Sequence, residues 1–158
     1  LNNYQKSIPD EHIFFCENSA VNAILSYFSG QARTFGITYT VSASIPKHIS
    51  ISETDLSILF GNLLENAIDA CNAQSGDDKK IIVRAKTDNH SLCVTIDNTF
   101  SGSLDIDQEG HFVSSKHEGL GLGTESIKSI AEKYGGVCQF EANNGMFYAS
   151  VMCFKDHA

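Results

Sequence analysis

The chain has 158 residues, a formal net charge of −8 and an apolar content of 42%. That composition fills one core, so we expect a single domain over residues 1–158. The negative charge disfavours nucleic acid and anionic membrane surfaces as direct partners, because both would repel the chain. No run approaches the roughly 18 apolar residues that span a bilayer, so a soluble domain is expected.

The first half of the chain predicts two helices and a strand. Asn18 suits a helix N-cap, and apolar residues then recur at helical spacing up to Gly36. The segment ITYTVSASI alternates like a strand and is closed by Pro46. A longer helix is expected from Ser52, where SETD supplies a capping residue and early acidic side chains, to about Ala73. Its apolar residues recur at helical spacing and form one stripe that is expected to face the core.

The second half predicts two hairpins with a helix between them. KIIVRAKT and SLCVTIDN are strand-like and are joined by the turn DNH. After a loop over 99–119, a third helix ends at Gly135 and Gly136, and the strands VCQFEA and MFYASVMCF are joined by NNG. Hairpins alternating with helices predict an α/β (α+β) two-layer sandwich, with a mixed, mostly antiparallel sheet and helices on one face.

The five cysteines argue against a covalent or metal framework. Their number is odd, they lie in apolar stretches and they show no C-x-x-C spacing. We therefore expect buried free thiols in a reducing compartment.

Four oxygen-bearing side chains share the polar side of the second predicted helix. They are Asn62, Glu65, Asn66 and Asp69, and Asp69 is a candidate cofactor-binding residue. At about 100° per residue, these positions fall within roughly a quarter turn of one another. Asparagine is a poor helix former, so two in one turn suggest a purpose other than helix stability. Magnesium takes oxygen ligands with waters and substrate phosphates, which suits Asn66, and a solvated helix face is the competing interpretation.

A glycine-rich segment, EGLGLGT, opens the third predicted helix. Glycines at 119, 121 and 123 allow close backbone approach, and the free amides and dipole of a helix mouth attract phosphate. A helix-entry turn without a ligand is the alternative. The ending of a Walker A loop is missing, and the late position does not suit a dinucleotide fingerprint. The preceding residues predict a mobile flap, with Lys116 as a phosphate-facing cation.

These motifs carry a resemblance to a known superfamily. ENAIDA on a helix, a strand ending in Asp97-Asn98, and a later GLGLG leading into SIKSIAEKYGG occur in the order seen in gyrase, Hsp90, histidine kinases and MutL. The chain resembles this GHKL superfamily, which has the Bergerat fold. FFCENSAVNAILSYFSGQARTFGI, NLLENAIDAC, TIDNTF and the SSK before the glycines are most similar to catalytic domains of sensor histidine kinases, particularly the quorum-sensing (AgrC-like) type.

The resemblance implies ATP and Mg²⁺ as cofactors and assigns a role to each motif. Asn66 would bind the magnesium that bridges the phosphates, supported by Asn62 and Glu65. Asp97 would accept a hydrogen bond from the adenine amino group, with Asn98 as the alternative. Gly119, Gly121 and Gly123 would let the helix mouth and the flap wrap the phosphates, and Lys116 would neutralise their charge.

Three departures from the family pattern bear on function. Asn62 stands where gyrase and Hsp90 place the glutamate that activates water, so hydrolysis is not the expected reaction. Asp69 stands where kinases often carry a basic residue, which leaves the phosphate contact to Lys116 or an unidentified group. After Asp97 the usual D-x-G-x-G is replaced by DNTFS.

The resemblance implies transfer of the ATP γ-phosphoryl group to a histidine on a separate dimerisation domain of the same receptor, with a response regulator downstream. His12 is followed by Ile13 and lacks the acidic residue that follows the family's phosphoacceptor, as well as its helical pattern, so the acceptor is expected outside this chain. The domain would lie on the cytoplasmic side of a membrane-anchored receptor. A non-catalytic nucleotide-binding or interaction module is the alternative, suggested by the altered strand motif and Asp69, and a GHKL ATPase is the third hypothesis.

Overall fold

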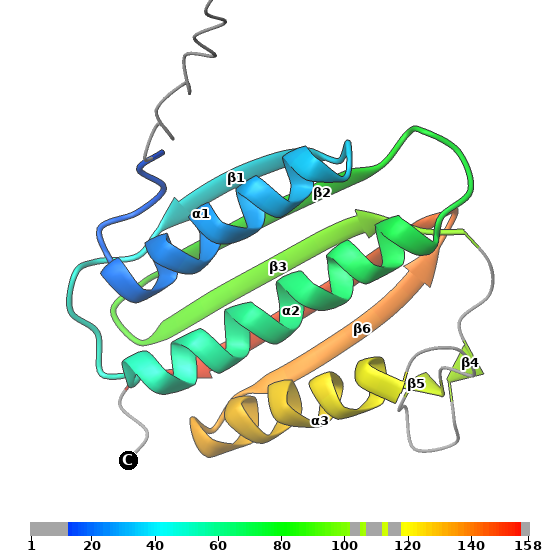
Figure 1. Ribbon diagram of the computed structural model, residues 1–158. Helices are drawn as coiled ribbons and strands as arrows, with labels where there is room; N and C mark the ends of the chain where they lie inside the picture. Colours follow the sequence, from blue (N-terminus) through cyan, green and yellow to red (C-terminus); the bar gives the residue numbers. More distant parts are fainter. Residues whose placement is uncertain (1–12, 102–104, 107–111, 114–117, 156–158) are drawn as a thin grey trace, which may run out of the picture.

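The computed structural model describes residues 13–101, 105–106, 112–113 and 118–155. In chain order its elements are α1 (Ser19–Thr34), β1 (Thr38–Ser44), α2 (Glu53–Ala73), β2 (Lys80–Thr87), β3 (Ser91–Thr99), β4 (Asp105–Ile106), β5 (Phe112–Val113), α3 (Glu118–Lys133), β6 (Val137–Asn143) and β7 (Met146–Phe154). The three helices lie on one face of a five-stranded sheet (Figure 1). The predicted two-layer α/β sandwich is thus confirmed.

The sheet is mixed and mostly antiparallel, as predicted. Its strand order is β1-β2-β3-β7-β6. Strands β1 and β2 run parallel, and the other three neighbouring pairs of this sheet are antiparallel. Because β1 and β2 are parallel, α2 forms the crossover connection between them. Figure 1 shows this asparagine-bearing helix between α1 and α3.

The predicted caps begin the first two helices. Asn18 Oδ1 accepts a hydrogen bond from the backbone N–H of Val21 at 3.1 Å. Ser52 Oγ accepts one from the N–H of Asp55, also at 3.1 Å. Each bond satisfies a donor that has no partner within its own helix. After α3, Gly135 adopts a φ of +68°, which is the left-handed ending expected of a C-terminal glycine.

Both predicted hairpins form. At the β2–β3 turn, Asp88 Oδ1 accepts hydrogen bonds from the backbone N–H groups of His90 (2.8 Å) and Ser91 (2.7 Å). These bonds hold the pKa of the Asp88 carboxyl below its ordinary value. At the β6–β7 turn, Asn144 and Gly145 have φ values of +50° and +76°, the backbone that an Asn-Gly hairpin turn requires.

The glycine-rich segment differs from expectation. The third helix begins at Glu118, so Gly119, Gly121 and Gly123 belong to its first two turns instead of a loop before it. Within the helix, Gly123 is buried against α2, at a place where a larger residue would contact side chains of α2. The region expected to be a flap contains the short antiparallel pair β4–β5, and the rest of it lies outside the described residues.

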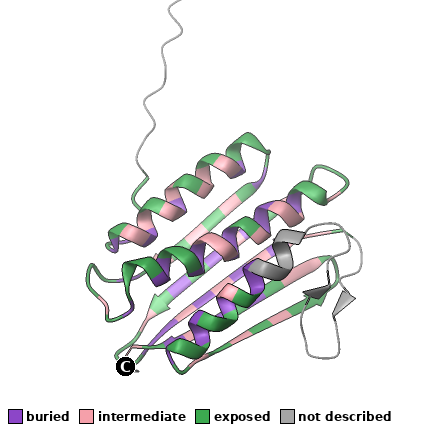
Figure 2. Ribbon diagram, turned by 60° about the horizontal axis from the view of Figure 1, so that its bottom comes forward, coloured by how far each residue is buried: buried purple, intermediate pink, exposed green. Residues whose placement is uncertain are grey.

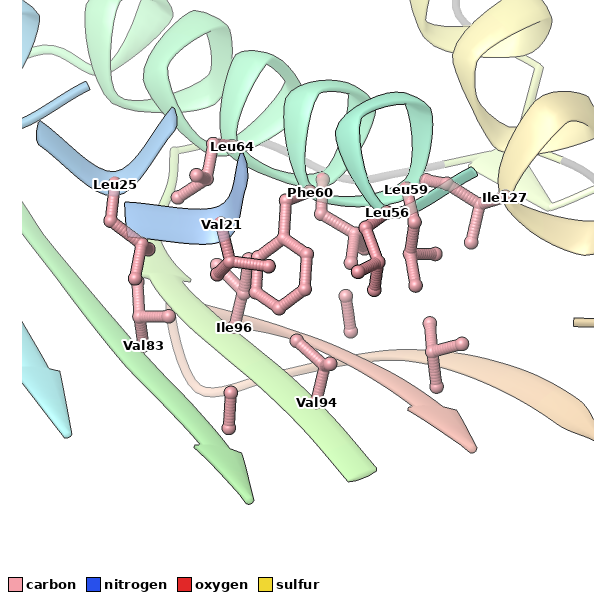
Figure 3. Packing of buried hydrophobic residues seen from close by; sticks show 14 of the residues in the cluster. Val21, Leu25, Leu56, Leu59, Phe60, Leu64, Val83, Val94, Ile96 and Ile127 are labelled. Carbon is pink, nitrogen blue, oxygen red and sulfur yellow. The ribbon is translucent and has the colours of Figure 1, made fainter. Parts of the chain in front are cut away.

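The core fills the space between the helices and the sheet. Figure 2 shows buried residues gathered on the sheet-facing sides of the helices and on the strands beneath them. In Figure 3, Phe60 points from α2 toward Val94 and Ile96 of β3, and all three are at most 1% exposed. Burying one such side chain contributes about 1.5–3 kcal/mol, so α2 is held mainly by its apolar stripe. Its opposite side is left for polar residues.

The cysteines are free thiols, as predicted. Cys16, Cys71 and Cys153 are buried, and Cys93 and Cys138 are half-buried. Burial raises the pKa of Cys153 to about 11.

None of the helices in the described part of the chain combines the length and hydropathy needed to cross a membrane.

Candidate functional site

Two asparagines of α2 and one glycine of α3 meet at the centre of the candidate site. A methyl group in place of the Gly123 hydrogen would lie 3.3 Å from Asn66 Oδ1 and 3.4 Å from Asn62 Oδ1. The same methyl would lie 3.6 Å from Asn66 Nδ2. The backbone of α3 thus approaches the ends of both carboxamides closely, as only glycine allows without displacing them. The structure brings the two predicted motifs together.

The two asparagines differ in what their amides do. Asn62 Nδ2 donates a hydrogen bond to the carbonyl oxygen of Ile58 in the preceding turn, at 2.8 Å. That bond turns its Oδ1 toward α3 and leaves it as an acceptor. Asn66 is half-buried, one turn further along the same face. A carboxamide oxygen suits a hard cation as a ligand, and a neutral carboxamide does not act as a base toward water.

The other two members of the predicted cluster face elsewhere. Glu65 and Asp69 line a hollow of about 300 Å³ on the α1 side of α2, opposite the aromatic residues Tyr27 and Phe35. All four positions lie on α2, as predicted, but α1 and α3 lie on either side of α2, so neighbouring positions on one helix meet different partners. The support for Asn66 predicted from Glu65 and the cofactor contact predicted from Asp69 therefore stay predictions.

Asp97 and Asn98 point to opposite faces of the sheet. The alternation of β3 turns Ile96 and Asn98 toward the helices, where Asn98 is 2% exposed, and turns Asp97 away from them. On the outer face, Asp97 Oδ2 accepts a hydrogen bond from Arg84 Nη1 at 3.2 Å. Of the two residues considered for adenine, the geometry therefore favours Asn98, whose Nδ2 donates to the carbonyl of Thr99 at 3.0 Å.

The end of β3 lies against the last turns of α2. Cys71 Sγ is 3.6 Å from the carbonyl oxygen of Thr99 and 3.7 Å from its Oγ1. Asn98 precedes Thr99, and Asn66 lies a little more than one turn before Cys71 on α2. The end of β3 and Gly123 thus both lie against α2, the first at Cys71 and the second at Asn62 and Asn66.

The remaining predicted site residues lie at the start of α3 or just before it. Gly119 and Gly121 lie in the first turn of α3, and Lys116 lies outside the described residues. Among the residues that the structure describes, no three His, Cys, Asp or Glu side chains gather as a metal-binding group.

One polar cluster, at the other end of the α2–α3 pair, was not predicted. Asp55, in the first turn of α2, accepts hydrogen bonds from Lys133 Nζ at 2.8 Å and Tyr134 Oη at 2.5 Å. Tyr134 Oη in turn accepts from the N–H of Ser52 at 3.2 Å. The motif SETD predicts the cap at Ser52, but the partners of Asp55 are about 80 residues away and leave no local signal in the sequence.

The comparison with protein families agrees with this arrangement. Residues 51–153, from just before α2 to the end of β7, match the family described as the GHKL domain. The chain belongs to the GHKL domain family. The matched range includes the asparagines of α2, the end of β3 and the glycines of α3.

Among curated proteins, this GHKL domain is similar to the probable C4-dicarboxylate sensor kinase of Bacillus subtilis (strain 168). The two are 23% identical over 138 residues, which cover 82% of this chain and 25% of the relative. The GHKL domain thus spans about a quarter of the length of that relative.

Solved structures with a similar fold include catalytic domains of histidine kinases. A nucleotide-free catalytic domain of the histidine kinase ThkA superposes with a TM-score of 0.68 at 20% identity, covering 87% of this chain and 91% of that one. The mycobacterial sensor histidine kinase MprB gives 0.65 at 17% identity, with 88% and 95% covered. ThkA in complex with the response regulator TrrA gives 0.64 at 20% identity, with 87% and 40% covered. This GHKL domain therefore has the fold of histidine kinase catalytic domains.

Proposed function

We propose that this GHKL domain binds ATP with Mg²⁺ and transfers the γ-phosphoryl group to a histidine on a separate dimerisation domain of the same receptor. The observation that carries the proposal is the contact of Asn62 and Asn66 with Gly123. It places two carboxamide oxygens beside a helix whose early glycines leave its backbone open to close approach.

The residues present suit the nucleotide and its metal. Asn66 Oδ1 would be the protein ligand for Mg²⁺, because carboxamide and phosphate oxygens are the donors that this ion takes in nucleotide sites. When bound, the ion neutralises charge on the phosphates. Buried Asn98, at the end of β3, would receive the adenine edge. With Asn98 in the first place of D-x-G-x-G, the motif becomes N-T-F-S-G and recovers its last glycine at Gly102.

Phosphoryl transfer fits the site better than hydrolysis. Where a water-activating ATPase needs a carboxylate, Asn62 presents a neutral carboxamide already engaged with Ile58. Such a residue holds geometry but accepts no proton. Transfer to a histidine needs chiefly positioning and charge neutralisation, because the imidazole is itself the nucleophile. The domain would then supply the bound nucleotide, and the partner domain the acceptor.

We also propose the type of receptor that contains this domain, its downstream partner and its location. A receptor of the quorum-sensing type is supported by the motifs NLLENAIDAC and TIDNTF and by the helical segment FFCENSAVNAILSYFSGQARTFGI. A solved relative in fold, ThkA, is described in complex with a response regulator, which supports such a regulator as the downstream partner. On this proposal the domain lies on the cytoplasmic side of the membrane that anchors the receptor.

The test is phosphotransfer in the longer receptor that contains this domain. Incubation with γ-labelled ATP and Mg²⁺ should give an acid-labile, base-stable phosphoprotein, and Asn66→Ala in the same receptor should not. A receptor that binds nucleotide but forms no phosphohistidine would support the non-catalytic binding module. Steady release of inorganic phosphate by the isolated domain would support an ATPase and reject the kinase proposal.

A further inference from the structure

The cluster of Ser52, Asp55, Lys133 and Tyr134 joins the beginning of α2 to the end of α3, and we name it the far-end clamp. The Asp55 side chain is 11% exposed, and its Oδ2 receives both the ammonium of Lys133 and the hydroxyl of Tyr134. A carboxylate removed from water in this way needs such donors. Because Tyr134 Oη also accepts the N–H of Ser52, one hydroxyl is bonded to both the cap and the first turn of α2.

The same end of α3 is also bonded to the sheet. The backbone N–H of Phe154, the last residue of β7, donates to the carbonyl oxygen of Tyr134 at 2.9 Å. Gly136 approaches β7 so closely that a Cβ on it would lie 1.7 Å from the carbonyl oxygen of Met152. The C-terminal end of α3 therefore has little freedom to slide or rotate.

The clamp and the asparagine contact lie at the two ends of one antiparallel helix pair. The start of α2 meets the end of α3 at Asp55 and Lys133, and the middle of α2 meets the start of α3 at Asn66 and Gly123. At 1.5 Å per residue, Gly123 lies about 15 Å along α3 from Lys133, and Asn66 about 16 Å along α2 from Asp55. The spans match, as expected for two antiparallel helices that pack side by side, so the clamp and the Gly123 contact are two contacts of one helix pair.

We propose that the far-end clamp positions Gly123 against Asn62 and Asn66 and thereby controls nucleotide affinity from the opposite end of α3. The proposal rests on the proposed function, because it concerns the same nucleotide site. A Cβ on Gly123 would lie 3.3–3.4 Å from the two carboxamide oxygens, so the space that glycine leaves there is about one methyl group in size, and a small axial shift of α3 would change it. Tyr134 and Asp55 touch no nucleotide in this account and act only as positioning residues.

The test uses Tyr134→Phe, which removes one hydroxyl and keeps the ring. Its matched control is Tyr39→Phe, which removes a hydroxyl that donates to the carbonyl of Leu25 at 3.1 Å, between β1 and α1. Affinity for a non-hydrolysable ATP analogue with Mg²⁺ is measured by calorimetry, and stability by urea unfolding. Tyr134→Phe should weaken binding at least about threefold, and Tyr39→Phe should leave it unchanged.

Two further readouts separate positioning from a general loss of stability. The amide resonance of Gly123 in the nucleotide-free protein should shift in Tyr134→Phe and stay in place in Tyr39→Phe. In a double-mutant cycle, the effects of Tyr134→Phe and Gly123→Ala on affinity should be non-additive, because both act through the same contact. Additive effects, or equal losses of affinity in the two tyrosine variants, would reject positioning.

The same measurements distinguish a failure of the clamp proposal from a failure of the proposed function. A wild-type protein that binds no nucleotide overturns the proposed function and this inference together. If the wild type binds, Asn66→Ala loses binding and Tyr134→Phe binds like the wild type, the nucleotide site stands and only the clamp proposal is overturned.

Discussion

Lys133 Nζ lies 2.8 Å from Asp55 Oδ2, and this contact makes the stability of the domain depend on pH in a defined window. The hydrogen bonds from Lys133 and Tyr134 lower the pKa of Asp55 below its ordinary 3.8. A lowered carboxyl pKa adds stability that is present above the ordinary value and is lost as pH falls through the folded-state pKa. The pKa of Lys133 is raised by the same bond, so the lysine stays charged throughout this window.

Asp55→Asn should therefore lower the free energy of unfolding at neutral pH by about 1–3 kcal/mol. The difference from the wild type should stay constant from pH 7 to about pH 5 and shrink below about pH 4, where the wild-type carboxylate begins to lose its advantage. Urea unfolding at several pH values measures both curves. A difference that keeps its neutral-pH size at pH 3 would contradict this account.

If Asn66 is the protein ligand for Mg²⁺, as proposed, Asn66→Ala should lower affinity for the ATP analogue with Mg²⁺ by at least about tenfold. The control is Asn72→Ala, an exposed asparagine on the same helix that lines the hollow beside α1. Calorimetric titration compares the two variants with the wild type. Equal affinities in Asn66→Ala and Asn72→Ala would exclude Asn66 from the site.

Gly123→Ala should separate nucleotide binding from stability. Alanine favours a helix over glycine by up to about 1 kcal/mol, so the folded state should lose little or gain slightly. The added methyl lies 3.3 Å from Asn66 Oδ1 and should displace the carboxamide, which lowers nucleotide affinity. Thermal unfolding and analogue titration on one preparation measure both. Unchanged affinity would show that the Asn66 carboxamide can shift without any loss of nucleotide binding.

Asn98→Ala and Asp97→Ala form a pair of variants that tests the face of β3 used for adenine. Asn98 is buried on the helix side, so its loss should cost about 1–3 kcal/mol of binding free energy. Asp97 pairs with Arg84 on the outer face, and breaking that half-exposed pair should change stability by less than about 1 kcal/mol and leave affinity unchanged. The opposite ranking of the two affinities would return the adenine contact to Asp97.

Gly136→Ala tests how closely the end of α3 lies on β7. Its new Cβ would fall 1.7 Å from the carbonyl oxygen of Met152, so we expect a loss of at least about 2 kcal/mol in the free energy of unfolding. Gly30→Ala, in α1, meets nothing within 4 Å and should stabilise by up to about 1 kcal/mol. Denaturant unfolding that gave both variants the same sign would contradict these contacts.

Local chemistry explains why most elements could be predicted. A cap such as Asn18 or Ser52 bonds to an N–H three residues away, so its signal and its consequence lie in the same short segment. The turn at Asn144 and Gly145 is likewise encoded by the residues that adopt its backbone. The apolar stripe of α2 predicted its buried face by periodicity alone.

The site was harder to predict because its relationships are long-range. The sequence places Glu65 beside Asn66, but only the positions of α1 and α3 on either side of α2 separate the two. The choice between Asp97 and Asn98 depends on which face of β3 is covered by helices. The helical state of Gly119 and Gly121 runs against glycine's propensity, and the partners of Asp55 lie at the far end of another helix.

The parallel pairing of β1 with β2 has a consequence for the kinetics of amide hydrogen exchange. Helix α2 connects two hydrogen-bonded neighbouring strands and packs on β3, which is hydrogen-bonded on both sides, so we expect its amides to be released only when the sheet itself opens. The segment around Asn66 should therefore exchange with the slowest cooperative unit of the domain, at a rate set by global unfolding. The half of the candidate site carried by α2 is thus built into the most persistent part of the fold.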